Sequence, residues 1–190
     1  MLRKPNGYAN ASDSRTRKKW APIIAAFMQG DLDRLKSLQR TGTRGRIFMR
    51  LVEEIWKLLE QPYHLEPIFD HCSPEPWYID FVAFHRVKLR THPFYNPDFL
   101  LYDNTWVEAT LSENTAYAKF FRYGHQAPRL KVVWLDEDVG FYKSLCSAVA
   151  FPNAEALNVA TLFPRMSECK GGDLLIQKIS LLKSLKGSVL

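Results

Sequence analysis

The chain has few cysteines, no long hydrophobic run and no low-complexity tract, and each of these absences excludes a class of protein. Its 190 residues include three cysteines, Cys72, Cys146 and Cys169, without CxxC spacing. This pattern argues against a disulfide framework or a cysteine zinc site and predicts reduced thiols. No apolar segment approaches the roughly 18 residues of a membrane span, so we expect no membrane contact.

The N-terminal segment has basic residues but lacks the apolar stretch of a signal peptide. We therefore expect a cytoplasmic protein that is not secreted. Twelve Phe, eight Tyr and five Trp supply ample apolar area for a core, so most of the chain is not expected to be disordered.

Positive charge is concentrated at the beginning of the chain. Residues 1–50 contain twelve Lys and Arg against three acids, a balance of +9, whereas the other 140 residues have a balance of −3. Such asymmetry indicates contact with a polyanion, most commonly nucleic acid, although a solvated basic tail is the simpler interpretation. The candidate nucleic-acid contacts are Arg15, Arg17, Lys18, Lys19, Arg44 and Arg46.

The first part of the chain, residues 1–45, is predicted to be a basic N-terminal arm with short helices. The helical segment between Trp20 and about Gln39 is broken at Gly30, and residues 41–46 have the composition of a turn. Residues 47–60 follow as the clearest helix, ended by Pro62. One face of that helix carries apolar residues, namely Phe48, Leu51, Val52, Ile55 and Leu59.

The second part, residues 46–151, is predicted to be the core, and 152–190 a C-terminal helical extension. Strands are expected at 63–69 (an edge strand), 77–84, 97–103, 105–111 and 130–136. Helices are expected at 112–124, 140–151 and 173–185. This order predicts an α/β fold with a central mixed sheet flanked by helices.

Two acidic residues stand out because each lies in or beside an apolar strand. Asp98 begins the strand at 97–103, and Glu108 lies in the next strand beside Trp106 and Val107. A carboxylate among apolar neighbours costs several kcal/mol unless it is paired, protonated or bound to a cation. Two carboxylates that are brought together commonly hold a hard divalent metal, which can activate water and neutralise the charge of a phosphodiester.

The length of the loop between these strands decides whether the two carboxylates meet. A two-residue loop at 103–104 would place Asp98 and Glu108 on opposite faces of the hairpin. A three-residue loop at 103–105 would bring Asp98, Glu108 and Thr110 to one face. The metal hypothesis therefore requires an odd loop or a bulge.

The segments Pro97-Asp98-Phe99-Leu100-Leu101 and Trp106-Val107-Glu108-Ala109-Thr110 together resemble the core motif of the PD-(D/E)-x-K nuclease superfamily. Within it, the chain is most similar to phage endonuclease I-type Holliday junction resolvases and to the endonuclease subunit of heteromeric transposases. The resemblance covers about residues 46–137. It implies a restriction-endonuclease-like αβββαβ core in a bacterial or phage-infected cell.

By this resemblance, Asp98 and Glu108 are metal ligands, the carbonyl of Ala109 faces the metal, and the preceding helix adds Glu54 or Glu53, with Glu54 preferred. The cofactor is Mg²⁺, for which Mn²⁺ can substitute. The family lysine falls at position 110, where this chain has Thr110. Lys119 on the next helix is the candidate replacement, with Thr110 as a weaker aid to the attacking water.

The leading hypothesis is a divalent-metal-dependent DNA endonuclease whose basic N-terminal segment binds the phosphate backbone. A junction, a transposon end and a specific duplex site are all compatible substrates, and a homodimer or a recombination partner protein is implied by double-strand cleavage. The alternative is a nuclease-like module that has lost catalysis and binds DNA or a partner protein.

Overall fold

The computed structural model describes residues 21–31, 41–65, 69–70, 94–95, 97–111, 116, 119–120, 122–124, 126–136 and 151–185. Residues 1–20 and 32–40 of the predicted N-terminal part, the strand at 77–84 and residues 140–150 of the next predicted helix lie outside these residues, as do Cys72 and Cys146. Residues 21–29 are helical and end in a turn at Gly30, whose φ is 80°, as the sequence predicts.

Helix α3 (Thr41–Leu58) is the longest helix in the described part of the chain. Its predicted apolar face is buried, including Phe48, Leu51 and Ile55. The prediction of a turn at 41–46 was wrong, because these residues form the first turns of α3. Thr43 is buried and Arg44 pairs with Asp136, and these tertiary contacts outweigh the low helix propensity of two glycines.

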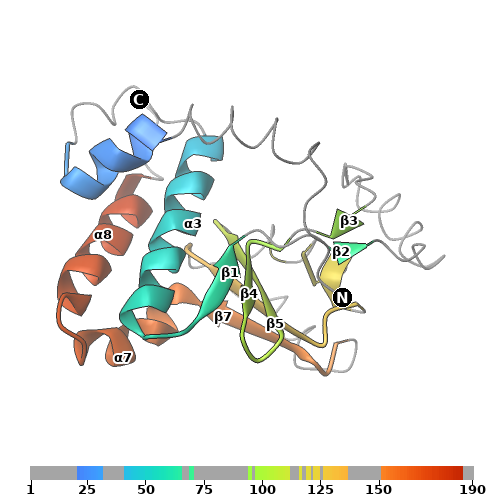
Figure 1. Cartoon of the computed structure of the whole chain (residues 1–190). Coiled ribbons are helices and arrows are strands. Elements are labelled where there is room, and N and C mark those ends of the chain that lie inside the picture. Colours follow the sequence, from blue (N-terminus) through green and yellow to red (C-terminus); the bar gives the residue numbers. More distant parts are fainter. Residues whose placement is uncertain are drawn as a thin grey trace.

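Five strands form one mixed sheet in the order β1-β4-β5-β6-β7 (Figure 1). Their bounds are β1 (Tyr63–Leu65), β4 (Phe99–Leu101), β5 (Thr105–Thr110), β6 (Arg129–Trp134) and β7 (Ala154–Asn158). The pairs β1–β4 and β4–β5 are antiparallel, whereas β5–β6 and β6–β7 are parallel. The predicted edge strand, the hairpin and the strand near 130–136 are therefore confirmed where they are described.

The C-terminal part contains the helix predicted at 173–185, which is confirmed as α8 (Gly172–Ser184), but it also contains a strand that was not predicted. It begins with β7, which adds a fifth strand to the sheet, and continues with the 3-10 helix η1 (Val159–Leu162), α7 (Phe163–Ser167) and α8. The sequence Ala-Glu-Ala-Leu-Asn of β7 has good helix formers, and its pairing with β6 overrides that local preference. A separate two-stranded sheet consists of β2 (Phe69–Asp70) and β3 (Phe94–Tyr95).

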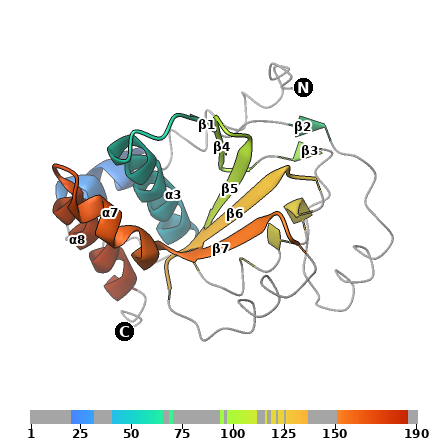
Figure 2. The same ribbon diagram turned by 90° about the horizontal axis from the view of Figure 1, so that it is seen from below.

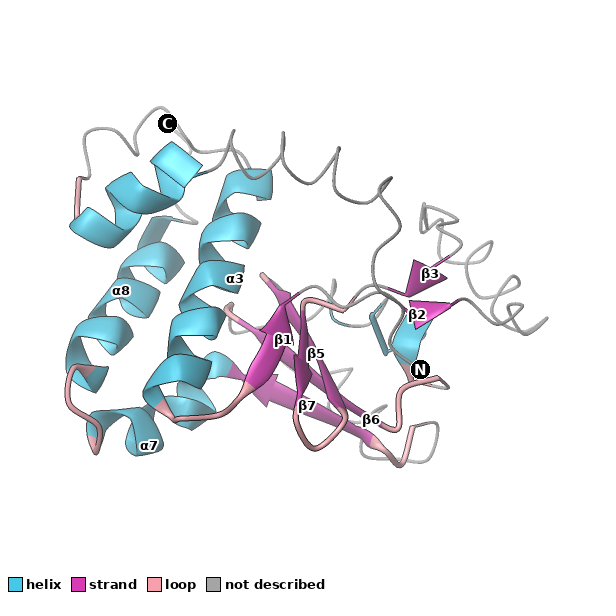
Figure 3. Ribbon diagram, viewed as in Figure 1, coloured by secondary structure: helices cyan, strands magenta, loops and turns pink. Residues whose placement is uncertain are grey.

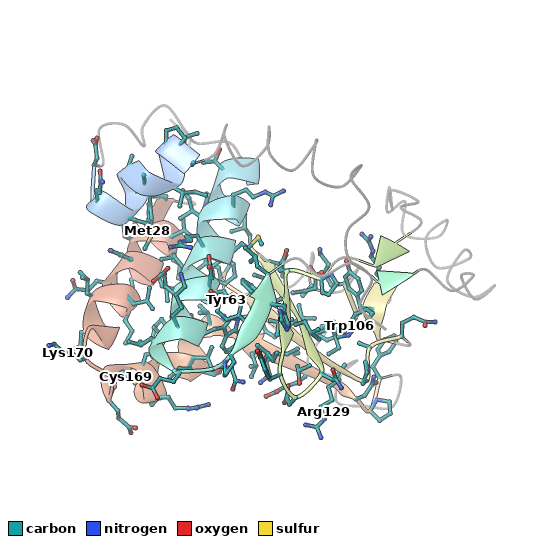
Figure 4. All side chains as sticks on the ribbon, viewed as in Figure 1. Met28, Tyr63, Trp106, Arg129, Cys169 and Lys170 are labelled. Carbon is teal, nitrogen blue, oxygen red and sulfur yellow. The ribbon has the colours of Figure 1, made fainter. Side chains whose placement is uncertain are left out.

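The two faces of the main sheet pack against different elements. Helices α3, α7 and α8 gather on one side of it (Figures 2 and 3), and Val107 of β5 belongs to the apolar core on that side. On the other side Trp106 (labelled in Figure 4) packs with Phe120, Tyr123 and Phe151 in a second cluster. The side chains of β5 therefore alternate between the α3 face and what we call the far face.

One buried apolar cluster joins the three parts of the chain that the sequence analysis separated at 45/46 and 151/152. Phe27 from the first helical segment, Phe48 of α3 and Ile179 of α8 belong to the same buried cluster. Among the described residues, no helix combines the length and apolarity needed to cross a lipid bilayer.

Candidate metal centre

The β4–β5 hairpin sets the positions of the two predicted acidic residues. Phe99 pairs with Val107 and Leu100 with Trp106. The connection is therefore a three-residue loop, Tyr102–Asn104, one position earlier than the three-residue loop considered from the sequence. Asn104 takes the left-handed conformation (φ 63°) and donates its N–H to the Leu101 carbonyl, a common geometry for such a loop.

This register puts Asp98 and Glu108 on the same face. Continuing the pairing by one residue brings Asp98 opposite Glu108, on the far face with Leu100 and Trp106. The Asp98 Oδ2 atom accepts the backbone N–H of Ala109 at 2.8 Å. The condition that the sequence set for a shared site, an odd loop, is fulfilled.

Glu108 is a fully buried carboxylate with an ammonium group beside it. Its exposed fraction is 0%, and the Lys119 Nζ atom lies 2.5 Å from its Oε2 atom. The Lys119 ammonium and the Tyr123 hydroxyl both face this carboxylate as hydrogen-bond donors. Because a carboxylate offers about four lone-pair sites, a cation that replaced the ammonium would find a ligand here.

Lys119 belongs to a helical segment that covers the far face, which we call the Lys119 segment. Its described residues are Ala116, Lys119, Phe120, Arg122 and Tyr123. Burial acts to lower the pKa of Lys119, but the negative charges of Glu108 and Asp98 outweigh it, and this pKa is raised. The ammonium therefore stays charged and interacts electrostatically with both carboxylates.

Tyr123 is a further member of the cluster that the sequence analysis missed. Burial, and then the nearby Glu108 charge, raise the pKa of its hydroxyl, so Tyr123 stays protonated. The Lys119 ammonium lies 5.9 Å and the Arg122 guanidinium 5.1 Å from the centre of its ring. Its position four residues after Lys119, on the same helical face, was the available signal in the sequence.

The donor set of this cluster suits a hard divalent cation with an incomplete protein shell. Asp98 and Glu108 offer carboxylate oxygens, and the Ala109 carbonyl points to the same strand edge as its N–H, toward Asp98. No group of three or more His, Cys, Asp and Glu gathers as a metal site in the described part of the chain. Mg²⁺ commonly binds one or two carboxylates and completes its shell with water and phosphate oxygens, so the residues fit it.

Thr110 and Glu54 have different relations to this cluster. Thr110 is buried and lies on the far face two residues after Glu108. Glu54 does not join the cluster, because α3 covers the opposite face of the sheet, where Glu54 pairs with Arg50 at 2.7 Å and Lys57 at 3.0 Å. Glu53 on the same helix accepts a hydrogen bond from Tyr63.

Arg44, one of the predicted nucleic-acid contacts, is engaged within the fold. Its guanidinium pairs with buried Asp136 at 3.2 Å and donates to the Leu182 carbonyl at 3.3 Å, so it joins α3 to the end of β6 and to α8. Arg46 is half-buried on α3 and contacts the Met49 sulfur. The other predicted basic contacts, at positions 15, 17, 18 and 19, lie outside the described residues.

A scan against protein-family models and searches of curated proteins and of solved structures found no match to this chain. The interpretation of the cluster therefore depends on its residues and its geometry.

Proposed function

We propose that this protein is a divalent-metal-dependent DNA endonuclease of the PD-(D/E)-x-K type. The observation that carries the proposal is the meeting of Asp98 with the wholly buried Glu108 on one face of an antiparallel hairpin. The order of α3, three antiparallel strands, the Lys119 segment and the parallel strand β6 supports an αβββαβ core. The +9 charge of residues 1–50 supports a polyanionic substrate.

In this proposal Asp98, Glu108 and the Ala109 carbonyl hold Mg²⁺ or Mn²⁺, which supplies Lewis acidity and a more acidic bound water. Lys119 supplies a positive charge at the site, which can stabilise charge that develops on a phosphate. The Thr110 hydroxyl on the same face can position the attacking water. Buried Trp106 and Tyr123, with ring centres 6.0 Å apart, form the apolar wall of the site.

The proposed contacts to the phosphate backbone remain Arg15, Arg17, Lys18, Lys19 and Arg46. Contacts of this kind give affinity without reading a sequence, so a branched junction, a transposon end and a specific duplex site all fit. Cleavage of both strands at one site requires two such centres, which a homodimer or a partner nuclease in a recombination complex would supply.

The direct test is incubation of the protein with supercoiled plasmid and with four-way-junction DNA, in Mg²⁺, in Mn²⁺ and in EDTA. We expect metal-dependent cleavage that falls more than about 100-fold in Asp98→Asn and in Glu108→Gln, since changes outside the ligand shell alone cost roughly 10–100-fold. Glu54→Gln is the matched control and should cleave normally. Cleavage that persists in Asp98→Asn and Glu108→Gln would exclude this site.

A second candidate function is supported by the Lys119–Glu108 ion pair and by Thr110. An ammonium can compensate Glu108 without any metal, as in a module that binds DNA or a partner protein and no longer cleaves it. Salt-sensitive binding to junction DNA with no cleavage in either metal would favour this module.

A further inference from the structure

The Lys119 ammonium already lies where a cation bound to Glu108 would lie. Its Nζ atom is 2.5 Å from Glu108 Oε2, and Glu108 is wholly buried, so the carboxylate meets this ammonium inside the protein. A metal ion that coordinated this oxygen and the ammonium could not occupy the same position. The two cations therefore compete for one carboxylate.

We infer that Lys119 is the built-in counter-ion of the Asp98–Glu108 pair and that its side chain must leave Glu108 before a divalent metal binds there. The inference rests on the proposed metal site and adds its regulation. The Lys119 side chain is 28% exposed, whereas Glu108 is wholly buried within β5. Lys119, rather than the carboxylate, is thus the part that moves.

Because of this competition, the affinity for the metal depends on whether the Lys119 ammonium has another anionic partner. In the proposed nuclease, a phosphate oxygen of the substrate is an anionic partner that can receive Lys119 once it leaves Glu108. Substrate and metal then favour each other's binding through one side chain, and this coupling is reciprocal. A metal ion is expected to bind weakly to the protein alone.

The test measures binding of Mn²⁺ to the DNA-free protein, from the free-ion signal in electron paramagnetic resonance. Lys119→Met removes the competing charge, so we expect Mn²⁺ to bind about tenfold more tightly or better. Lys131→Met is the matched control, since Lys131 also pairs with a carboxylate, Glu155, at 3.1 Å, and is similarly exposed. The control should bind Mn²⁺ as the wild type does.

Adding Glu108→Gln to Lys119→Met should abolish the gain in Mn²⁺ affinity. That result would assign the gain to this site. Unchanged or weaker Mn²⁺ binding by folded Lys119→Met overturns the inference. Because cleavage is not measured, the nuclease proposal can fail while tighter Mn²⁺ binding by Lys119→Met still upholds the inference. Conversely, if the wild-type protein cleaves DNA but Lys119→Met shows no gain in Mn²⁺ affinity, the nuclease proposal stands and the counter-ion inference fails.

Lys119→Met leaves Glu108 without its ammonium and can prevent folding, so a second measurement uses the wild-type chain. Saturation with Mg²⁺ should shift the side-chain NMR signals of Lys119 toward those of an exposed lysine, while the signals of Lys131 stay in place. Mg²⁺ binding that leaves the Lys119 signals unchanged overturns the inference.

Discussion

Two carboxylates of this protein are almost completely buried, yet their surroundings differ. Asp136 at the end of β6 pairs with Arg44, which also donates to the Leu182 carbonyl and so links three elements. Glu108 within β5 pairs with Lys119 and lies opposite a second carboxylate, that of Asp98. Packing and stability account for the first pair, whereas two carboxylates brought together with a buried ammonium are typical of a functional site.

The largest expected effect tests the structural member of this comparison. Arg44→Met leaves Asp136 buried without its ion pair, so we expect the free energy of unfolding to fall by about 3–5 kcal/mol. Urea unfolding measures this change. Arg50→Met on the same helix is the control, because its ion pairs with Glu53 and Glu54 are partly exposed and worth about 1 kcal/mol or less.

Addition of Mn²⁺ should leave the difference in stability between Arg44→Met and the wild type unchanged, because Asp136 belongs to no metal site in this interpretation and an ion bound at Glu108 stabilises both proteins alike. A loss smaller than that of Arg50→Met would show that the Arg44–Asp136 pair is not structural. The contrast between the two carboxylates would then disappear.

The second prediction concerns the docking of the Lys119 segment on the far face. At Gly124 an added Cβ would lie 2.3 Å from the Phe151 side chain and 2.6 Å from the Phe120 carbonyl oxygen. Gly124→Ala should therefore destabilise the protein by about 1–3 kcal/mol, by forcing the segment and Phe151 apart. Thermal unfolding measures the loss, and DNA cleavage should fall with it because Lys119 is displaced.

Gly45→Ala is the matched control, since a Cβ there meets no atom within 4 Å and Ala favours the interior of α3. It should stabilise the protein by about 0.5–1 kcal/mol. If the two substitutions change the stability equally, the structure accommodates a Cβ at Gly124 without loss of stability.

The sequence predicted the elements that place the site and also its two acidic residues. The apolar face of α3 and the strands of the hairpin follow from periodicity, because burial on one face imposes it. Lys119 was a reasonable candidate because the connection between parallel strands β5 and β6 must cross one face of the sheet. That prediction concerned position alone, and the chemical role of Lys119 stays a prediction.

Other residues could not be assigned from local patterns. Arg44 is one of many basic residues near the N-terminus, and its partner Asp136 lies 92 positions away. Glu53 and Glu54 are adjacent in the sequence, and only the packing of α3 shows that this helix covers the wrong face for a shared metal. Strand β7 was missed because its pairing with β6 is a long-range contact that its composition does not indicate.

The third prediction separates the charge of the functional pair from its packing. The double variant Lys119→Met/Glu108→Met replaces both charged groups by apolar side chains of similar length, so the desolvation penalty disappears with the ion pair. We expect the free energy of unfolding to stay the same or to rise by about 1 kcal/mol, as for other buried ion pairs that have been replaced. Chemical denaturation measures it, and DNA cleavage should be lost.

The corresponding double variant Arg44→Met/Asp136→Asn should remain less stable than the wild type, because it also loses the hydrogen bond to the Leu182 carbonyl. Equal outcomes for the two double variants would contradict the division into a structural and a functional pair.

The smallest expected effect is a pH dependence of the free energy of unfolding. It arises on the α3 face, where Glu53 accepts a hydrogen bond from Tyr63 and pairs with Arg50 and Lys57. Burial acts to raise the pKa of Glu53, but the hydrogen bond from Tyr63 at 2.8 Å and the charges of Arg50 and Lys57 outweigh it and lower the pKa. A lowered carboxyl pKa stabilises the folded state above the unfolded value of 4.5, and that contribution is lost as the pH falls through the folded pKa.

Tyr63→Phe should therefore cost about 1 kcal/mol or less at pH 7, and the difference from the wild type should shrink as the pH falls below 4.5 and through the lowered pKa of Glu53. Urea unfolding at pH 7 and at an acid pH measures the two differences. Tyr102→Phe is the control, because Tyr102 is 70% exposed and its substitution should change stability by less than about 0.5 kcal/mol at either pH. Because the ring contact with Phe99 is kept in Tyr63→Phe, a deficit that is equal at both pH values would mean that the Tyr63 hydroxyl stabilises the protein independently of the Glu53 charge.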